Sequence, residues 1–366
     1  MKYKLHLLIL LMVVLLSGCA SPESSKLVLP GPVVQPSPPV FIDEVDAILS
    51  DSLEAFLPPL NEWPPREDSS PGPEGAYIIQ QTVPLSSLAC FSRLKRRLWN
   101  ALEIEGISEF EIRRYPSPGG ETWELTVDAE DMITYQVELV QKIEGRVAII
   151  IDDFGNSLRN KDILLELDYP LTLAILPGLA YSSRVDQLAA ENGFEVMLHC
   201  PLEAINPDLP LGPGAIRCDT PSDELIRIFD DDILGLPHIV GVNNHMGSAF
   251  TTDTEAMRRL LTEVKRNDLF FIDSLTIGGT VTRSLAEELG VAFGRRDIFL
   301  DHENTEEYIN RQFEALKKKA KDRGFAIAIG HDRPLTMNML LHLIPTLAED
   351  NIQLVPASAL IFSPKK

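Results

Sequence analysis

From Arg146 onward, short apolar segments alternate with longer amphipathic segments, and this repeat restricts the possible fold more than any other feature of the chain. The apolar segments have strand length, and the amphipathic segments carry apolar residues at helical spacing. Parallel strands joined by helices form a sheet that is covered on both faces, so its strands are apolar throughout. The predicted strands are Val147–Ile151, Leu171–Leu176, Glu195–Leu198, Ile239–Val242, Leu269–Ile272, Ile298–Leu300, Phe325–Ile329 and Ile352–Val355.

Seven or eight such units over residues 146–366 favour an α/β fold closed into a (β/α) barrel, with an open sheet as the alternative. Gly193 and Gly324 stand where the preceding helices should end, because a left-handed residue commonly ends a helix. Residues 77–145 predict a separate small α/β domain. It has a helix at 85–102 and two strands, 110–115 and 122–127, joined by a turn that contains proline and glycine.

Residues 19–76 are rich in proline, and residues 20–75 hold 12 of the 27 prolines in the chain. Such a composition favours extended polyproline II and predicts a tether. Residues 41–57 interrupt the tether with apolar residues at helical spacing. They form either a short helix that packs on the chain's own domains or a helix that docks an envelope protein partner.

The first 18 residues have the pattern of a lipoprotein signal peptide. Two lysines precede an unbroken apolar run, Leu7–Leu16, which is too short to span a bilayer comfortably. Leu16-Ser17-Gly18-Cys19 resembles a lipobox, in which the cysteine carries the lipid. We therefore expect lipidation at Cys19 and a place in the cell envelope. By resemblance to lipoproteins that lack aspartate after the lipidated cysteine, Ala20 favours the periplasmic face of the outer membrane. A plain secretory signal peptide is the alternative to the lipoprotein signal.

The net charge excludes one class of partner, and the remaining cysteines limit the number of disulfides. A formal net charge of −21 argues against a nucleic-acid partner, since phosphate backbones are bound by clustered Lys and Arg. Beyond Cys19 the chain has Cys90, Cys200 and Cys218, so these three allow one disulfide at most. Cys200–Cys218 is the nearest pair, and buried free thiols are the alternative.

Polar residues collect just after the predicted barrel strands. Four of the seven histidines stand there, and a random distribution would scatter such residues over the helices and both barrel ends. The carboxyl ends of barrel strands are where barrel enzymes build their active sites. The residues are Asp152 and Asp153, His199, Asn243 to His245, Asp273, Asp301 and His302, and His331 and Asp332.

These residue types predict hydrolysis at a divalent metal such as Zn²⁺, which takes imidazole and carboxylate ligands and keeps one position for water. Asp153, His199 and His245 can supply three ligands from different strands. A bound metal acidifies water and polarises a carbonyl. Asp152 is placed to accept the proton of that water, and His331 to protonate the leaving group.

Six segments of the barrel region resemble the divergent polysaccharide deacetylases. They cover about residues 146–362 in the right order. They are Ile149-Ile-Ile-Asp-Asp-Phe-Gly155, Met197-Leu-His-Cys-Pro-Leu-Glu203, Gly241-Val-Asn-Asn-His-Met-Gly-Ser248, Phe270-Phe-Ile-Asp-Ser274, Arg295-Arg-Asp-Ile-Phe-Leu-Asp301 and Ala326-Ile-Ala-Ile-Gly-His331. The resemblance implies a distorted barrel, a divalent metal site and removal of N- or O-acetyl groups from carbohydrate.

The resemblance also implies roles for single residues. Asp152 resembles the superfamily's general base, Asp153 its first metal ligand, and His199 the first histidine of its His-x-x-x-His pair. Glu203 stands at the second position of that pair, so either His245 or Glu203 must replace the missing ligand. The family's Arg-x-Pro-Tyr segment is absent, and Leu275 stands where members tend to carry arginine.

Five further residues are expected near the site. Asn243 and Asn244 either bind substrate or satisfy loop backbone groups. Asp273 is expected to orient a histidine. Arg296 and Asp297 are either catalytic or a structural ion pair.

Three functions follow. The first is a metal-dependent deacetylase of an envelope or extracellular polysaccharide, and the second is a barrel with little activity that binds glycan or a partner. The third is a metal-free glycosidase that uses Asp152 and Asp273.

Overall fold

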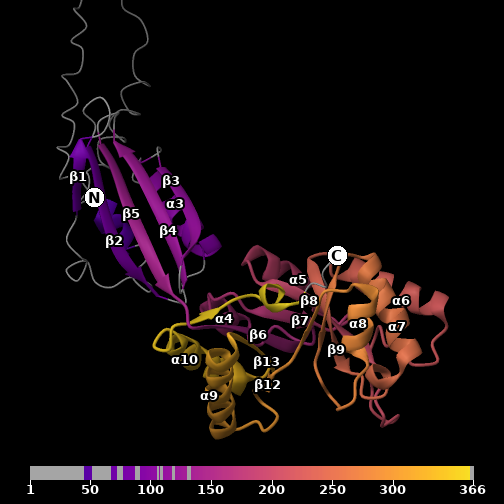
Figure 1. Ribbon diagram of the computed structural model, residues 1–366. Coiled ribbons are helices and arrows are strands. Elements are labelled where there is room, and N and C mark those ends of the chain that lie inside the picture. Colours follow the sequence, from indigo (N-terminus) through magenta and orange to yellow (C-terminus); the bar gives the residue numbers. More distant parts are fainter. Residues whose placement is uncertain are drawn as a thin grey trace, which may run out of the picture. The chain divides into compact units, whose positions relative to one another are not determined.

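Two β-sheets organise the part of the chain that the structure describes (Figure 1). This computed structural model describes residues 45–51, 67–71, 77–86, 91–104, 107, 110–117, 120–129 and 133–362. The predicted signal peptide, Cys19, Cys90 and most of the tether lie outside these residues. Both sheets belong to one unit of residues 42–366.

The first sheet has five strands in the order β1-β2-β5-β4-β3. Trp123, Leu125 and Val127 alternate along β4, and each is at most 1% exposed, so one face of this strand forms the core with Leu98 of the helix. The antiparallel pairing of β3 with β4 confirms the predicted hairpin. The elements are β1 (Glu67–Pro71), β2 (Tyr77–Leu85), α3 (Phe91–Ile104), β3 (Phe110–Ser117), β4 (Gly120–Ala129) and β5 (Ile133–Lys142).

Two observations concern the region before residue 77. β1 lies within the range predicted as a tether, and it pairs antiparallel with β2, so the first sheet begins before Tyr77. Residues 45–51 are helical, inside the predicted 41–57 helix, and Val45 and Leu49 are fully buried. The apolar side of this short stretch is therefore covered by the chain itself.

The second sheet forms the barrel and holds most of the predicted strands. Its strands run in the order β11-β10-β9-β8-β7-β6-β13-β12, all neighbours are parallel, and β14 pairs with β6. This is the predicted α/β fold, a curled parallel sheet of eight strands along its main path. The strands are β6 (Gly145–Phe154), β7 (Thr172–Ile175), β8 (Glu195–Leu202), β9 (Ile239–Met246), β10 (Phe270–Asp273), β11 (Phe293–Arg295), β12 (Ile298–Phe299), β13 (Phe325–His331) and β14 (Ile352–Leu354).

Helices lie on the outside of this sheet (Figure 1). They begin and end largely where the sequence indicates; α9, for example, ends at Gly324, whose φ is 84°. None of the described helices is long and apolar enough to cross a membrane. The helices are α4 (Lys161–Glu166), α5 (Ser182–Glu191), α6 (Ser222–Gly235), α7 (Thr254–Arg266), α8 (Thr282–Leu289), α9 (Glu306–Arg323) and α10 (Pro334–Leu343), with 3₁₀ turns η3 (Phe250–Thr252), η4 (Ile344–Leu347) and η5 (Ala357–Leu360).

The central strand β6 shows why the strands are apolar on both faces. Ile149 and Ile151 belong to the large cluster that packs under the helices, whereas Ala148 and Ile150 belong to a smaller inner cluster. All four side chains are fully buried. A strand covered on both sides is apolar between its ends, so after the exposed Arg146 near its start the next polar side chains of β6 appear at the carboxyl edge.

The two edges of the barrel sheet are joined by a short segment that the sequence did not fully predict. β11 pairs with β10 and β12 pairs with β13, yet only Arg296 and Asp297 separate β11 from β12. The Arg296 amide donates to Asp273 O (3.0 Å), and the Asp297 amide donates to Ile327 O (2.8 Å). One continuous segment therefore supplies both edges of the sheet, with no crossover helix between them. The sequence missed β11 because three residues with a central glycine carry no periodicity.

Candidate metal centre

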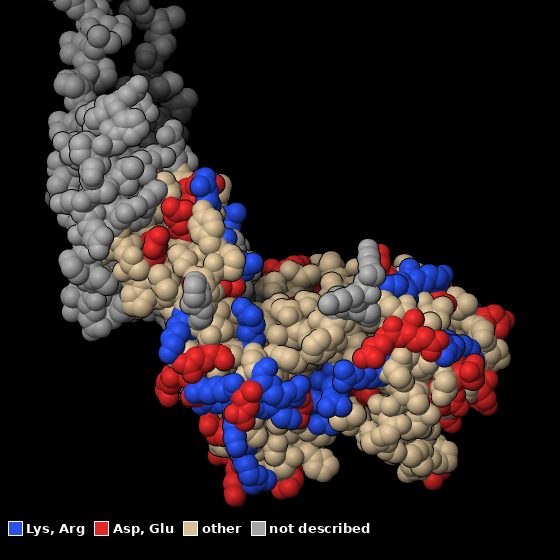
Figure 2. Space-filling model, viewed as in Figure 1, with Lys and Arg blue, Asp and Glu red and all other residues tan. Residues whose placement is uncertain are grey.

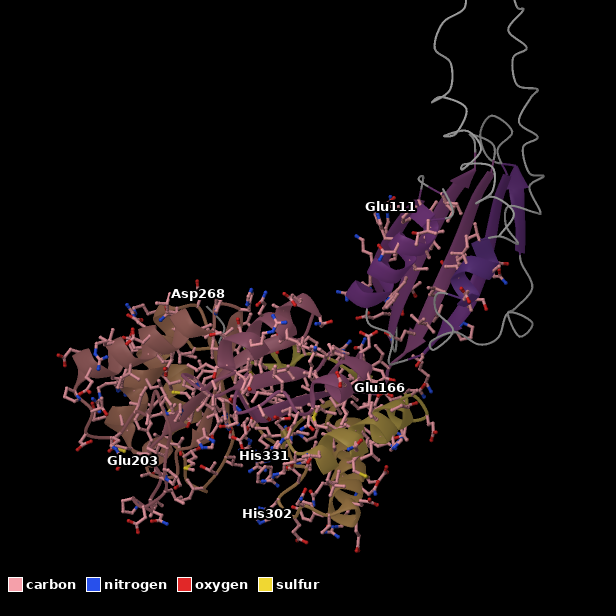
Figure 3. The ribbon with its side chains drawn as sticks, turned by 180° about the vertical axis from the view of Figure 1, so that it is seen from behind. Glu111, Glu166, Glu203, Asp268, His302 and His331 are labelled. Carbon is pink, nitrogen blue, oxygen red and sulfur yellow. The ribbon has the colours of Figure 1, made fainter. Side chains whose placement is uncertain are left out.

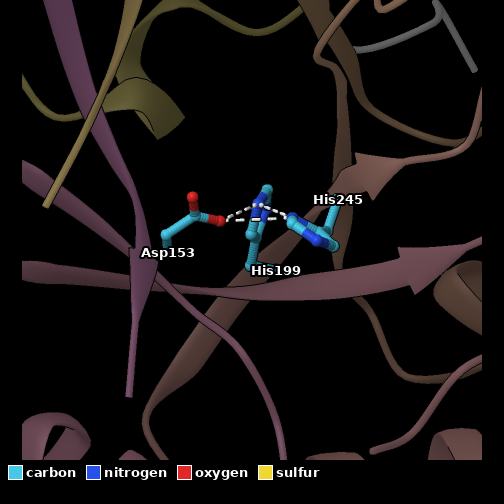
Figure 4. A group of neighbouring side chains, drawn as sticks. All are labelled: Asp153, His199 and His245. Atoms are coloured by element: carbon cyan, nitrogen blue, oxygen red, sulfur yellow. Dashed lines mark hydrogen bonds and ion pairs between the residues drawn. The ribbon is translucent and has the colours of Figure 1, made fainter. Parts of the chain in front are cut away.

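Three strands bring an aspartate and two histidines to one point. Asp153 comes from β6, His199 from β8 and His245 from β9, as predicted (Figure 4). Their ligand atoms all lie within 4.8 Å of one another. β8 and β9 are neighbours and β6 lies two strands away, so side chains near their carboxyl ends converge in the barrel mouth.

A distortion at the end of β6 gives its two aspartates separate positions. Consecutive residues of a regular strand point to opposite faces, but the pairing of β6 with β7 shifts register between Ile151 and Phe154. Asp153 has a φ of 67°, in the left-handed region that non-glycine residues rarely adopt. A strand that bulges at this point re-aims its side chains. Asp152 is thereby buried at 3% exposure, while Asp153 faces the two histidines.

The facing atoms of the three residues form a nearly regular triangle. Asp153 Oδ1 lies 3.3 Å from His199 Nε2 and 3.2 Å from His245 Nδ1, and the two nitrogens are 3.1 Å apart. Ligands held 2.0–2.1 Å from a tetrahedral ion are separated by roughly 3.3 Å. The triangle therefore has the size of one face of a zinc coordination tetrahedron.

When His199 is neutral, the hydrogen bonds behind it place its proton on Nδ1 and not on Nε2. Asn243 is fully buried, and its Nδ2 donates to Asp152 Oδ1 at 2.8 Å. Its Oδ1 must then accept from His199 Nδ1, which lies 2.9 Å away. The neutral ring consequently turns a lone pair toward Asp153. Such an outer partner commonly fixes the tautomer of a metal-binding histidine.

A cation suits this cluster because Asp153 Oδ1 is buried and no described residue is its hydrogen-bond partner. Burial raises the pKa of Asp153, but its contacts with His199 and His245 outweigh burial and hold the pKa well below its usual value. Asp153 is thus ionised, and a bound cation would stabilise that charge in place of the imidazole protons. One carboxylate and two neutral imidazoles are a fitting donor set for Zn²⁺.

A histidine and an aspartate form a second pair beside the triangle. His331 Nδ1 lies 2.8 Å from Asp301 Oδ1, and the His331 amide donates to Asp301 Oδ2 at 2.9 Å. Thr336 Oγ1 also donates to that oxygen at 2.7 Å. His331 Nε2, the other ring nitrogen, lies 4.0 Å from Asp153 Oδ2. The pair therefore fixes His331 with its free nitrogen turned toward the candidate metal ligands.

Comparison with known proteins agrees with this geometry. The model of the family described as divergent polysaccharide deacetylase matches residues 149–361. The chain belongs to the divergent polysaccharide deacetylases. It is 34% identical over 223 residues to the uncharacterized protein YibQ of Escherichia coli K12, covering 61% of this chain and 69% of YibQ. It is 36% identical over 218 residues to an uncharacterized protein of Haemophilus influenzae, and the match covers 58% of this chain and 75% of that protein.

A solved structure supports the fold of this family member. The uncharacterized protein ATU2773 of Agrobacterium tumefaciens C58 matches with a TM-score of 0.57 and 24% identity. The match covers 60% of this chain and 91% of ATU2773. The family resemblance and the parallel α/β barrel that the sequence predicted are thus both confirmed.

Glu203, the alternative third ligand, does not join the triangle. Its Oε2 accepts a hydrogen bond from the Cys218 amide at 2.7 Å, and its Oε1 lies 3.8 Å from Arg217. Figure 3 shows Glu203 well apart from His331. Glu203 therefore fastens the loop after β8. Cys200 and Cys218 are both free thiols in this structure, so the disulfide that the sequence left open does not form.

Asp273 was expected to orient a histidine, and this prediction is wrong. Its Oδ1 accepts from the Leu275 amide and its Oδ2 from Thr280 Oγ1, both at 2.8 Å. Asp273 therefore shapes the loop after β10. Asn243 and Asp301 orient the two histidines instead. Asp301 stood among the residues after the strands, but nothing in the sequence paired it with His331, which is 30 positions away.

The other three expected residues also hold the rim together. Asn244 accepts from the Ser274 amide and donates to Met246 O, so it ties β9 to β10. Arg296 donates to two carbonyl oxygens of the loop after β10 and lies over the ring of Phe299. Asp297 instead accepts from Arg323 at 2.6 Å, so Arg296 and Asp297 each have other partners.

Proposed function

We propose that this protein is a metal-dependent hydrolase that removes N- or O-acetyl groups from an envelope or extracellular polysaccharide. The triangle of Asp153, His199 and His245 carries the proposal, because its edges of 3.1 to 3.3 Å match the spacing of zinc ligands. Membership of the family supports the reaction class. The metal, the polymer and the kind of acetyl bond are parts of the proposal.

Asp153, His199 and His245 would hold the ion. A divalent ion such as Zn²⁺ supplies two things there when bound, a polarised acetyl carbonyl and a water of lowered pKa. Asn243 holds His199 in the tautomer that can ligate. Removing such an outer partner typically costs 10–100-fold in metal affinity or activity.

Asp152 is the proposed general base. Its Oδ1 is held by Asn243, and its Oδ2 lies 3.7 Å from His199 Nε2, on the side of the ligand atoms. Burial raises the pKa of Asp152, and the nearby His199 and His331 oppose that rise. A carboxylate with a raised pKa holds a proton more firmly than an exposed one, which suits a group that must accept a proton from water.

His331 is the proposed general acid. Asp301 binds its Nδ1, so the proton for the leaving amine or alkoxide resides on Nε2, the nitrogen that faces the site. Burial lowers the pKa of His331, but the hydrogen bond and charge of Asp301 raise it by more. The base and the acid thus come from β6 and β13, which are neighbouring strands.

The two other functions predict different geometry or chemistry. The glycosidase requires Asp152 and Asp273 as a catalytic pair, but both oxygens of Asp273 accept hydrogen bonds from its own loop. A barrel that only binds glycan would need no histidine oriented as an acid, and the contact of His331 with Asp301 supports such a role. The deacetylase therefore accounts for more of the site.

The direct experiment measures bound metal and released acetate on the same preparations. Wild type should hold about one Zn²⁺ per chain and release acetate from an O-acetylated or N-acetylated oligosaccharide. His199→Ala should lose both. His302→Ala is the matched control, because His302 also follows a barrel strand, is exposed, and stands outside the triangle. Equal metal in wild type and His199→Ala would refute the site, and metal without acetate release would favour the glycan-binding function.

We also propose that the protein acts at the cell envelope, anchored by lipid on Cys19. The support is the apolar run and the Leu16-Ser17-Gly18-Cys19 box. Acyl chains contribute about 0.8 kcal/mol for each buried CH₂ group. Cys19→Ser should therefore move the protein from the membrane fraction to the soluble fraction, and an unchanged membrane fraction would contradict the anchor.

A further inference from the structure

A groove lies at the gap between the two edges of the barrel sheet, between β11 and the first half of β13, where the fold omits a helix. Two parallel strands normally need a crossover of a dozen or more residues, usually with a helix that covers the sheet. β11 and β12 are joined by Arg296 and Asp297 alone, so no helix covers the sheet between α8 and α9. A cavity of about 360 Å³ fills this position.

The floor of the cavity is apolar and its walls are aromatic. Val291, Phe293 and Ile327 contribute to the floor, and each is less than 9% exposed. Phe325 and Phe362 form a wall, with their rings edge to face at 5.5 Å between centroids. Phe362 is 60% exposed, although its backbone pairs with Phe293. These walls leave an apolar lining that the fold itself does not cover.

Three arginines surround the opening, on a chain whose net charge is −21. Arg283 is paired with Glu287 at 3.0 Å, and Arg323 with Asp297 at 2.6 Å. Arg295 has no ion-pair or hydrogen-bond partner among the residues that the structure describes. Figure 2 shows Lys and Arg gathered in a band between α9 and α8. One guanidinium at an apolar cavity is therefore available to an anion.

We propose that this groove binds a small amphipathic carboxylate, with its apolar body on the aromatic wall and its carboxylate on Arg295. A planar guanidinium can bind a carboxylate through two parallel hydrogen bonds. The cavity volume lies within the 300–1,000 Å³ typical of small-molecule sites. The site is separate from the metal triangle and does not depend on the proposed deacetylation.

The test is calorimetric titration of the full chain carrying Cys19→Ser, so that no attached lipid can fill the groove. Sodium decanoate should bind, and decan-1-ol, which lacks the charge, should bind about tenfold or more weakly. Arg295→Ala should weaken decanoate binding by about tenfold and leave decanol binding unchanged. Arg311→Ala is the matched control, since Arg311 is exposed on α9 and does not line the cavity.

A second variant tests the apolar wall without touching charge. Phe362→Ala removes an exposed ring while keeping the backbone pair with Phe293, so the fold should persist. This substitution should weaken the binding of both decanoate and decanol several-fold. Equal affinity for decanoate and decanol, or full decanoate binding by Arg295→Ala, would overturn the proposal. If neither decanoate nor decanol binds, the proposal is also overturned, and the result would point to a protein segment as the occupant.

Discussion

Two carboxylates in this barrel, Asp153 at the strand ends and Asp232 on α6, resemble each other until their neighbours are considered. Each has one oxygen that is buried and that finds no hydrogen-bond partner among the described residues. Asp153 Oδ1 faces two imidazole nitrogens at 3.2 and 3.3 Å. Asp232 instead lies against the backbone of Gly214, where an added Cβ would stand 2.5 Å from Oδ1.

The neighbours drive the two pKa values in opposite directions. The pKa of Asp153 falls well below its usual value, because the histidine contacts outweigh burial. Burial, together with the charge of Asp231, raises the pKa of Asp232 to about 7. An unpartnered buried carboxylate is therefore not a metal site by itself. It becomes one when other ligand atoms stand at coordination spacing around it.

The largest effect should come from removing His245, the ligand for which the sequence left Glu203 as an alternative. His245→Ala should lower metal affinity and acetate release by about 10³-fold, since one ligand supplies several kcal/mol. Glu203→Gln should leave both within about twofold, because Glu203 is held by Cys218 and Arg217. Competition with a zinc chelator measures the affinities. The reverse result would make Glu203 the third ligand.

Asp152→Asn should separate binding from chemistry. The amide can still accept from Asn243, so the fold and the metal should remain, whereas the base is lost. We expect a fall in the rate constant for acetate release of about 10²–10³-fold, with unchanged zinc content. Metal analysis and initial rates on one preparation decide this. Loss of metal together with rate would mean that Asp152 is itself a ligand.

Asp232→Asn should raise the free energy of unfolding at high pH, a gain that we do not expect from any substitution in the triangle. With a pKa of about 7 in the folded state and 3.8 in the reference state, the folded protein holds the extra proton between these values. Stability therefore falls as pH rises through this window, and the cost is complete above pH 7. The variant should gain about 1–3 kcal/mol at pH 8 and almost nothing at pH 4. Urea unfolding at both pH values measures the gain, and an equal effect at both would refute the raised pKa.

Asp301→Asn should give the smallest effect, on the pH dependence of the rate. The acid His331 must be protonated, so activity falls as pH rises through its pKa. Asp301 raises that pKa, and its loss should move the falling limb to lower pH and slow the reaction about tenfold. Metal content should not change. A pH–rate profile identical to that of the wild type would remove His331 from its role.

The periodicity of the sequence predicted most of the barrel, because its strands are buried on both faces and their apolar runs end abruptly in polar residues. The same abrupt ends predicted the triangle, since the carboxyl ends of parallel strands meet at one rim. Thr252 and Glu255 have the spacing of a capping box in the sequence, but Asp253, one position later, caps α7. Helix ends depend on local hydrogen bonds that neighbouring candidates can supply equally well.

The sequence could not predict which polar residues act and which hold loops. Asp273 and Asp301 both follow barrel strands, yet Asp273 binds its own loop and Asp301 binds a histidine 30 residues away. The different roles of Asp273 and Asp301 depend on the direction of each side chain and on the position of β11, a strand of three residues that shows no apolar periodicity. Asp232 was equally hidden, because its burial follows from the approach of Gly214.

Diffraction from zinc-soaked crystals at the zinc absorption edge tests the central claim most directly. The account predicts one strong anomalous peak that lies 2.0–2.2 Å from Asp153 Oδ1, His199 Nε2 and His245 Nδ1, with water in the fourth position. It predicts no peak beside Asp232, whose buried oxygen lacks histidine neighbours. A peak beside Glu203 or Asp232, or none within the triangle, would contradict the account.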